Sequence, residues 1–485
     1  MNYEAVIGLE VHAQLLTRSK IFSASSAAFG GEPNSRVDPV CLGLPGALPV
    51  LNKRAVEFAM RMGLATHCRI APVSVFARKN YFYPDLPRGY QISQFEEPLC
   101  ENGFVEIEWP GKVKRIGITR IHLEEDAGKS VHHEAFVDQN ETLVDVNRCG
   151  VPLIEIVSEP DIRSPKEAYL YLTRLKQIVQ YLEICDGNME EGSLRCDANI
   201  SVRPAGQELL GVKTELKNMN SFRGVEKALE FEITRQMKIL AGRGEVVQQT
   251  LLWNADRNEA VVMRSKEDSH DYRYFPDPDL VPLEIHREWV EEVRRSLPEL
   301  PAARKARLMT QYGIPEYDAE VLTSARELAD YYEQVVASSG GDGKVASNWV
   351  MGEVLRALKE KEQTIRDFAI SAESLGALIK LTVAGTINLK TAKTVFAEML
   401  ETGRSAQEIV TQKGLGQISD ADELTQQVRR VLRDNPTEVE KYRAGKKQVM
   451  GFLVGQVMRA TGGKANPKLV NEILQREIAQ SQQNH

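Results

Sequence analysis

Short runs that alternate between apolar and polar residues fill roughly the first 290 positions, and turn residues separate them. Such runs cover residues 3–15, 114–126, 151–160, 195–204 and 212–221. Alternation with a period of two is typical of half-buried strands. A parallel sheet needs a helical crossover between neighbouring strands, and no regular helix follows each of these runs. The pattern therefore predicts an α+β fold in which helices are inserted into a mixed or antiparallel sheet.

Helical periodicity replaces this alternation after the proline-containing stretch 297–301. Within the strand-rich part, Ser164 followed by Pro165 already predicts the start of one inserted helix. A length of 485 residues suits about three domains at roughly 150 residues each. We expect these domains to be a strand-rich domain over 1–293, a helical domain over 294–404 and a small helical tail over 405–485.

The composition narrows the class of protein. The net charge of −7 argues against a chain that coats nucleic acid along its whole surface. The six cysteines are scattered without a C-x-x-C pair, which favours a reducing cytosol. No stretch approaches ~18 uninterrupted apolar residues, and the N-terminus lacks a signal-peptide pattern. We expect a cytoplasmic protein that does not enter a membrane.

Common catalytic motifs are missing. Gly128-Lys129-Ser130 resembles the end of a phosphate-binding loop, but the glycine required five positions earlier is Leu123. The dinucleotide-binding, zinc-protease and serine-hydrolase patterns do not occur either. The sequence therefore predicts that any nucleotide is held in another way.

Polar side chains recur at every second position of four predicted strands, so they share one face of each strand. A solvated outer face with weak ion pairs explains any single strand. Imidazoles and guanidinium groups mixed with carboxylates also suit Mg²⁺ together with phosphate. Both interpretations stay open at this point. The residues concerned are Glu10, His12, Arg120, His122, Glu124, Asp126, Arg195, Asp197, Asn199, Ser201, Arg203, Lys213, Glu215 and Lys217.

Two further concentrations of residues stand out. Segments 78–85, 88–91 and 271–277 mix aromatic and basic residues, which suits either base stacking or aromatic loops packed at a sheet edge.

Residues 441–470 carry seven basic residues and no acid. Either this stretch is a solvated helix face or it contacts a phosphate backbone, and the excess of cations favours the second.

Taken together, these segments resemble the B subunit of the aspartyl/glutamyl-tRNA amidotransferase. The resemblance rests on long motifs, among them YEAVIGLEVHAQL, RKNYFYPDLPRGYQISQFEEP, GITRIHLEEDAGKS and MEEGSLRCDANISVRP, and it spans nearly the whole chain. Some members of that family carry a paired C-P-V-C where this chain has Asp38-Pro39-Val40-Cys41. A structural zinc ion at Cys41 is therefore not expected.

The resemblance implies a cradle-shaped catalytic domain like that of glutamine synthetase, a helical domain, and a tail that contacts tRNA. It implies that ATP, with Mg²⁺, phosphorylates the side-chain carboxylate of a glutamate or aspartate mischarged on tRNA, and that ammonia then displaces the phosphate. A glutamine amidase, the A subunit, would deliver the ammonia through a tunnel, and a small C subunit would clamp the heterotrimer.

The resemblance also implies roles for residues. As catalytic groups it favours Glu10, His12, Lys79 and Glu125. As metal ligands it favours Glu10, His12, Glu125 and Glu155, with Glu124 and Glu191 in reserve. For phosphate or nucleotide it favours Lys79, Tyr83, Arg195, Lys217, Arg264 and Tyr274. For tRNA it favours Lys446, Lys447, Arg459, Lys464 and Lys468.

Several alternatives stay open from the sequence. Strand alternation prefers Glu124 over Glu125 as the ligand unless a bulge intervenes. The chain could also be a non-catalytic RNA-binding scaffold, or a free-standing ligase that amidates a small acid. The preference between Glu-tRNA and Asp-tRNA, the tunnel residues and the bases read on the tRNA are not encoded in any recognisable motif.

Overall fold

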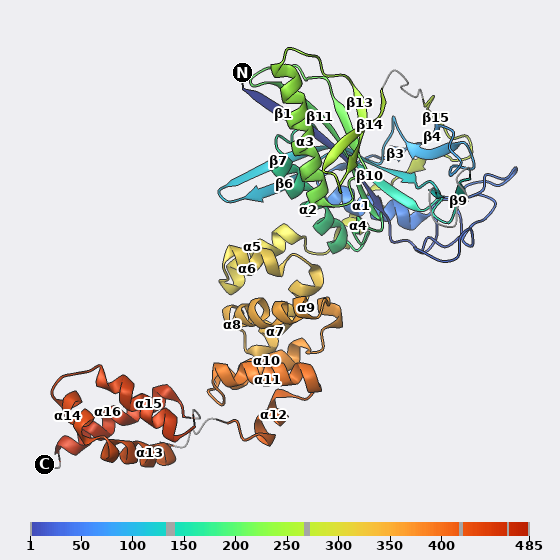
Figure 1. The fold of residues 1–485 in the computed structure, drawn as a ribbon. Helices are drawn as coiled ribbons and strands as arrows, with labels where there is room; N and C mark the ends of the chain where they lie inside the picture. Colours follow the sequence, from blue (N-terminus) through green and yellow to red (C-terminus); the bar gives the residue numbers. More distant parts are fainter. Residues whose placement is uncertain (1, 132–140, 266–271, 417–420, 463–464, 484–485) are drawn as a thin grey trace. The chain divides into compact units, whose positions relative to one another are not determined.

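The structure is a computed structural model that describes residues 2–131, 141–265, 272–416, 421–462 and 465–483. The chain divides into two compact units, Met1–Pro301 and Ala302–His485. The first unit is rich in strands and the second is helical, as the sequence predicts (Figure 1). No helix within the described ranges is long and apolar enough to cross a lipid bilayer.

A nine-stranded sheet forms the centre of the first unit, with strand order β14-β13-β12-β11-β1-β10-β7-β6-β2. All its neighbouring strands are antiparallel except β12 and β13, so the predicted mixed sheet is confirmed. In chain order the strands are β1 (Tyr3–Gln14), β2 (Arg69–Ile70), β6 (Cys100–Trp109), β7 (Lys112–Glu125), β10 (Pro152–Ser158), β11 (Leu194–Pro204), β12 (Thr214–Lys217), β13 (Gln249–Asn254) and β14 (Glu259–Ser265).

Three helices share a core with the apolar face of this sheet: α1 (Lys53–Ala65), α2 (Pro165–Tyr181) and α3 (Phe222–Ala241). The Ser164 hydroxyl accepts a hydrogen bond from the backbone N–H of Glu167, which confirms the predicted start of α2 at Pro165. Figure 1 shows α3 running along the sheet, where it packs against β11 and β14. Ile7, Leu9 and Val11 of β1 are almost fully buried in this core. Glu10 and His12 therefore lie on the opposite face of β1.

A three-stranded sheet, β15-β4-β5, brings two distant segments together. Its strands are β4 (Phe76–Asn80), β5 (Tyr90–Gln94) and β15 (Phe275–Pro276). Because Phe275 pairs with Arg78, the two aromatic and basic segments of the sequence lie side by side. The remaining elements of this unit are β3 (Val73–Ser74), β8 (Lys129–Val131), β9 (Leu143–Asp145), β16 (Leu283–Glu284) and α4 (Arg287–Arg295).

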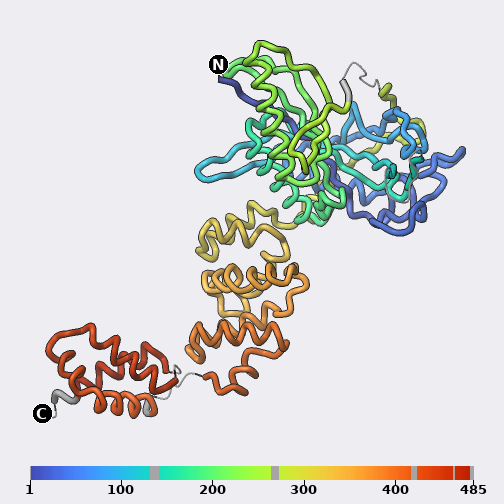
Figure 2. Tube along the Cα trace, viewed as in Figure 1, coloured from blue at the N-terminus to red at the C-terminus, as the bar shows by residue number. Residues whose placement is uncertain are grey.

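The helical unit contains two separate hydrophobic cores. The first core, between Leu308 and Val410, is built from α5 (Pro301–Tyr312), α6 (Glu316–Leu322), α7 (Arg326–Ser339), α8 (Gly343–Trp349), a π-helical turn (Val350–Val354), α9 (Leu355–Glu360), α10 (Ala372–Val383), α11 (Leu389–Thr402) and α12 (Ala406–Gln412). The second, between Leu424 and Ile478, belongs to α13 (Ala421–Asp434), α14 (Pro436–Arg443), α15 (Val449–Ala460) and α16 (Pro467–Gln483), which Figure 2 shows as one bundle.

Helix α12 falls on the tail side of the boundary expected at residue 405. Its Ala406, Ile409 and Val410 nevertheless pack into the first core together with α10 and α11. The core of the tail begins only at Leu424. An amphipathic helix buries its apolar stripe against whichever neighbour is present, and periodicity does not identify that neighbour.

Candidate active site on the polar face of the sheet

One row of side chains crosses four strands of the central sheet on its polar face. His12 on β1 lies opposite Arg195 on β11 and Glu155 on β10, and Glu155 lies opposite His122 on β7. Residues directly opposite each other in antiparallel strands point to the same face, with Cβ atoms ~5 Å apart. The register of the sheet thus places a cation, two imidazoles and a carboxylate side by side.

Glu124 adds a second carboxylate to this row. The Nε2 atom of His12 lies 3.3 Å from Oε2 of Glu155 and 3.5 Å from Oε1 of Glu124. The Nε2 atom of His122 lies 3.6 Å from Glu155 and 3.8 Å from Glu124. Three of these residues, His12, Glu124 and Glu155, could hold a metal ion, because one ligand atom from each lies within 4.8 Å of the others. We call His12, His122, Glu124 and Glu155 the histidine-carboxylate cluster.

The cluster shifts the proton affinities of its members. Burial lowers the pKa of His12, but its hydrogen bond to Glu155 and the charges of Glu155 and Glu124 outweigh burial and leave the pKa raised. Burial raises the pKa of Glu155, yet the two imidazoles and Lys79 bring it well below its usual value. The pKa of Glu124 is lowered in the same way, chiefly by the hydrogen bond from His122. Both carboxylates are therefore ionised and available as ligands near neutral pH.

A pH dependence of stability follows from His12. A group whose pKa is raised on folding stabilises the folded state fully below its unfolded pKa of 6.5, and this contribution is lost as the pH rises through the folded value. In buffer with a chelator, we expect the unfolding midpoint of the strand-rich unit to fall more steeply above pH 6.5 in the wild-type chain than in His12→Gln. Circular dichroism melts at several pH values measure this. Parallel pH profiles of the two chains would contradict the assignment.

A second row lies next to the cluster and is also charged. Glu10 is opposite Asp197, and the Asn199 amide donates a 2.8 Å hydrogen bond to the Glu10 carboxylate. Burial, together with the charges of Glu155 and Asp197, raises the pKa of Glu10. Lys217 on β12 forms ion pairs with Asp197 and Glu215. Glu10 thus lies beside the cluster, and among the described residues it forms no ion pair with a lysine or arginine.

Asp126 links the end of β7 to the row. Its Oδ2 atom accepts a 2.7 Å hydrogen bond from Gln14 and lies 3.1 Å from Arg195. Arg148 approaches the same oxygen at 3.6 Å. The carboxylate is almost fully buried, so it holds the Arg195 guanidinium at the edge of the cluster.

Glu125 and Glu191 lie apart from the cluster. The Glu125 carboxylate forms an ion pair with Arg88 and accepts a 2.8 Å hydrogen bond from the backbone N–H of Ile92. Alternation along β7 accounts for this, because Glu124 shares its face with His122 whereas Glu125 does not. Glu191 is exposed in the turn before β11, where its N–H donates to the Asn188 side chain.

Lys79 and several aromatic rings come from the small sheet and the segment before β15. The Lys79 ammonium lies 5.0 Å from the centre of the Tyr272 ring. Burial lowers the pKa of Lys79, but the charges of Glu124 and Glu155 raise it overall. Tyr274 stacks on Phe95 with ring centres 4.1 Å apart, and Tyr83 is exposed in a loop. Lys79 is thus electrostatically coupled to the cluster, with stacked rings near it.

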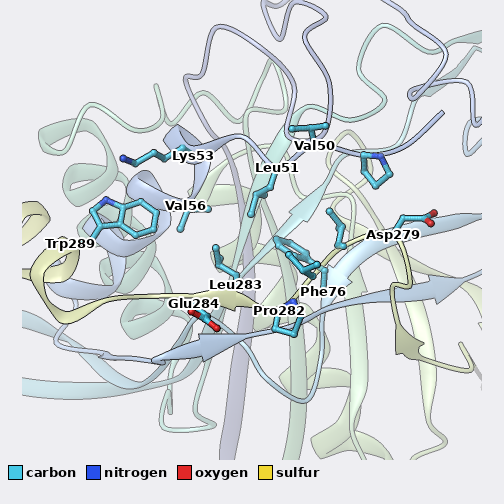
Figure 3. Close-up of a pocket in the computed structure, with 13 residues that line it drawn as sticks. Val50, Leu51, Lys53, Val56, Phe76, Asp279, Pro282, Leu283, Glu284 and Trp289 are labelled. Atoms are coloured by element: carbon cyan, nitrogen blue, oxygen red, sulfur yellow. The ribbon is translucent and has the colours of Figure 1, made fainter.

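The other candidate residues lie elsewhere. Arg264 is on β14 opposite Thr250, and its side chain is outside the described part of the structure. The four described tail cations are all exposed: Lys446, Lys447, Arg459 and Lys468. Lys464 lies outside the described residues. The Figure 3 pocket, of about 450 Å³, is lined mostly by apolar residues such as Leu51, Phe76 and Trp289, and no residue of the cluster lines it.

Strand alternation placed His122 on the polar face of its strand, but no role as a ligand or catalytic group was predicted for it. Its buried Nδ1 atom has no hydrogen-bond partner within the described structure. Gln14 and Arg88 were also missed. Gln14 continues the alternation of Glu10 and His12 and could have been found, whereas Arg88 lies in the turn before β5 and carries no periodic signal.

The strand-rich unit that carries the cluster belongs to a catalytic domain of the amidotransferase class, as comparison with known families shows. Residues 5–291 match the family model of the GatB/GatE catalytic domain, and residues 330–478 match that of the GatB domain. The chain is 56% identical to the B subunit of the aspartyl/glutamyl-tRNA(Asn/Gln) amidotransferase of Thermodesulfovibrio yellowstonii, over 98% of this chain and 99% of the relative. It is 57% identical to the corresponding protein of Geobacter sulfurreducens, over 99% and 100%.

This chain belongs to the family of aspartyl/glutamyl-tRNA(Asn/Gln) amidotransferase B subunits. The similarity covers the sheet unit and most of the helical unit, so the resemblance inferred from the sequence motifs is confirmed.

Proposed function

We propose that this chain catalyses the amidation of Glu-tRNA(Gln), Asp-tRNA(Asn) or both, using ATP to activate the side-chain carboxylate. The histidine-carboxylate cluster is the observation that carries the proposal. A row of two buried carboxylates, two imidazoles, Lys79 and Arg195 can hold a cation and bind phosphate oxygens within one site. The nine-stranded sheet that presents this row also supports the proposed likeness to the cradle of glutamine synthetase.

The donor set fits a divalent cation. His12, Glu124 and Glu155 offer one nitrogen and two carboxylate oxygens, and both carboxylates are ionised. Mg²⁺ prefers such oxygen ligands and keeps several waters. Glu10 lies beside the cluster and is a candidate for a further ligand of the cation. The Nδ1 atom of His122 has no hydrogen-bond partner among the described residues, so it can donate or accept one more hydrogen bond in this row. Glu125 and Glu191 contribute no ligand in this proposal.

ATP supplies the phosphoryl group that makes the substrate carboxylate reactive towards ammonia, and a cation held by His12, Glu124 and Glu155 would neutralise phosphate charge. The protein groups have distinct tasks. Lys79 and Arg195 attract the phosphate oxygens, and Asp126 keeps Arg195 pointed at the site. The rings of Tyr274 and Phe95 offer a stacking surface for a base. We also propose contacts with the phosphate or nucleotide for three further residues, Tyr83, Lys217 and Arg264.

Partner proteins and the tRNA complete the proposal. The family name denotes a B subunit, and we propose that a glutamine amidase, the A subunit, provides ammonia while a small C subunit holds the heterotrimer together.

The test of the proposed function is amidation of purified Glu-tRNA and Asp-tRNA by this chain with ATP, Mg²⁺ and ammonium chloride, with and without the amidase. Absence of amidation in both arms would refute the catalytic function. Rapid amidation of free glutamate without tRNA would favour a small-molecule ligase.

The exposed tail cations give a prediction about tRNA binding. Each phosphate contact adds to the dependence of affinity on salt. We expect Lys446→Gln/Lys447→Gln to weaken tRNA binding and to reduce the slope of log affinity against log salt by about 1.4, because each single-strand phosphate that is no longer neutralised removes roughly 0.7. Filter binding at several salt concentrations measures the tRNA affinity and its slope. The matched control is Lys359→Gln/Lys361→Gln, which changes two exposed lysines at the end of α9. An unchanged slope would show that the tail does not contact tRNA.

A further inference from the structure

Lys20 and Cys41 meet in the loops that follow β1. The Lys20 side chain is fully buried, and its Nζ atom lies 3.3 Å from the Sγ atom of Cys41, which is itself 4% exposed. Fully buried lysines are rare and are normally paired with an acid. Within the described residues, no carboxylate lies within 4.0 Å of this ammonium nitrogen. The lysine is therefore directed at the sulfur atom of a cysteine.

Hydrogen bonds from neighbouring loop residues hold Cys41 in place. The Asp38 carboxylate accepts hydrogen bonds from the Cys41 backbone N–H and from the Ser25 hydroxyl. The Ser23 hydroxyl lies 3.6 Å from the Cys41 sulfur. A second thiol is also near, because the Cys149 sulfur contacts the Cys41 carbonyl at 3.6 Å.

A cavity gives small molecules access to this region. It has a volume of about 460 Å³, and Ser23, Asp38 and Val40 are among the residues that line it. Ser23 and Asp38 both contact Cys41 directly or through its backbone. Cys41 itself does not line the cavity, but its two neighbours Ser23 and Asp38 do, so the cavity brings solvent next to the residues that contact the thiol.

We propose that Lys20 and Cys41 form a site of reversible oxidation that closes into a sulfenamide. Hydrogen peroxide first oxidises the thiol: a sulfur-oxygen bond forms, the peroxide O–O bond breaks, and one water is released. The Lys20 nitrogen then attacks the sulfur. A sulfur-nitrogen bond forms, and the hydroxyl group leaves as water together with a proton from that nitrogen. The bridge prevents further oxidation of the sulfur to its irreversible acids.

The test uses the full-length chain treated with dilute hydrogen peroxide and analysed by peptide mass spectrometry. We expect a cross-linked peptide that contains both residues and is lighter by about 2 Da than its two parts, as the loss of two hydrogens requires. Trypsin should no longer cut after Lys20 in this fraction. Dithiothreitol should restore both the mass and the cleavage site, because thiols reduce sulfur-nitrogen bonds.

A disulfide would cause the same mass loss, and Cys149 is the nearby candidate because its thiol contacts the Cys41 carbonyl at 3.6 Å. In Cys149→Ser, the cross-link must persist. In Lys20→Arg, it must vanish, and dimedone should trap the sulfenic acid on Cys41. Peptide mass spectrometry of the wild-type chain identifies the two residues joined by the cross-link even where a variant fails to fold. An unmodified Cys41, a sulfenic acid that leaves Lys20 cleavable, or loss of the bridge in Cys149→Ser would each overturn the proposal.

Discussion

Replacing Glu155 with glutamine is expected to lower the rate of ATP-dependent amidation by about 100-fold or more while leaving the fold intact. The Glu155 carboxylate is the centre of the cluster, 3.3 Å from His12 and 3.6 Å from His122. Its pKa is far below the usual range, so it carries a full negative charge that a cation can use. Glutamine keeps the size of the side chain and removes that charge.

The measurement is the initial rate of Glu-tRNA amidation with ammonium chloride as the nitrogen donor, so that ammonia delivery from a partner does not limit the rate. Glu106→Gln is a matched control, because Glu106 lies on β6 of the same sheet in an exposed ion pair with Arg115. We expect it to stay within about twofold of wild type, since exposed pairs contribute little. A Glu155→Gln chain with near wild-type activity would remove the cluster from the mechanism.

The same assay separates the two adjacent glutamates of β7. Glu124 faces His12 and His122, whereas Glu125 faces Arg88 and the backbone of Ile92. In this arrangement Glu124→Gln should lower amidation in the same way as Glu155→Gln. Glu125→Gln should act first on stability, because it weakens a buried ion pair outside the cluster.

Much of the polar row could be predicted from sequence because strand alternation is a local property. The positions of Glu10 and His12 on β1, of His122 and Glu124 on β7, and of Arg195 on β11 follow from a period of two. Alternation does not give the register between strands, however. That His12 faces Glu155 depends on how β1 and β10 pair, and their sequences are about 140 residues apart.

Other parts of the site depend on contacts that no local pattern contains. Lys79 lies near the cluster because β4 pairs with β5, and the Ser93 hydroxyl of β5 donates a hydrogen bond to Glu124 on β7. Alternation placed Asp126 on the polar face, but its partners Gln14 and Arg195 lie on other strands and follow only from the register. The extent of the first helical core was equally hidden, since the apolar stripe of α12 fits either neighbouring group of helices.

Removing Arg88 should cause the largest loss of stability of any single substitution considered. Its side chain is 6% exposed and that of Glu125 is 2% exposed, so the two charges are paired away from water. Removing one partner of a buried ion pair costs about 3–5 kcal/mol, because the other charge stays buried and uncompensated. We expect Arg88→Ala to lower the free energy of unfolding of the strand-rich unit by this amount.

Urea unfolding followed by circular dichroism measures this change. Arg69→Ala is the control: its ion pair with Glu101 is exposed on the same unit and should be worth less than about 1 kcal/mol. Arg88→Met/Glu125→Leu tests the cause, because replacing both charges with apolar side chains should recover most of the loss. If Arg88→Ala destabilises no more than Arg69→Ala, the pair is not desolvated. Glu125 would then be available to the site, and its exclusion from the ligand set would no longer hold.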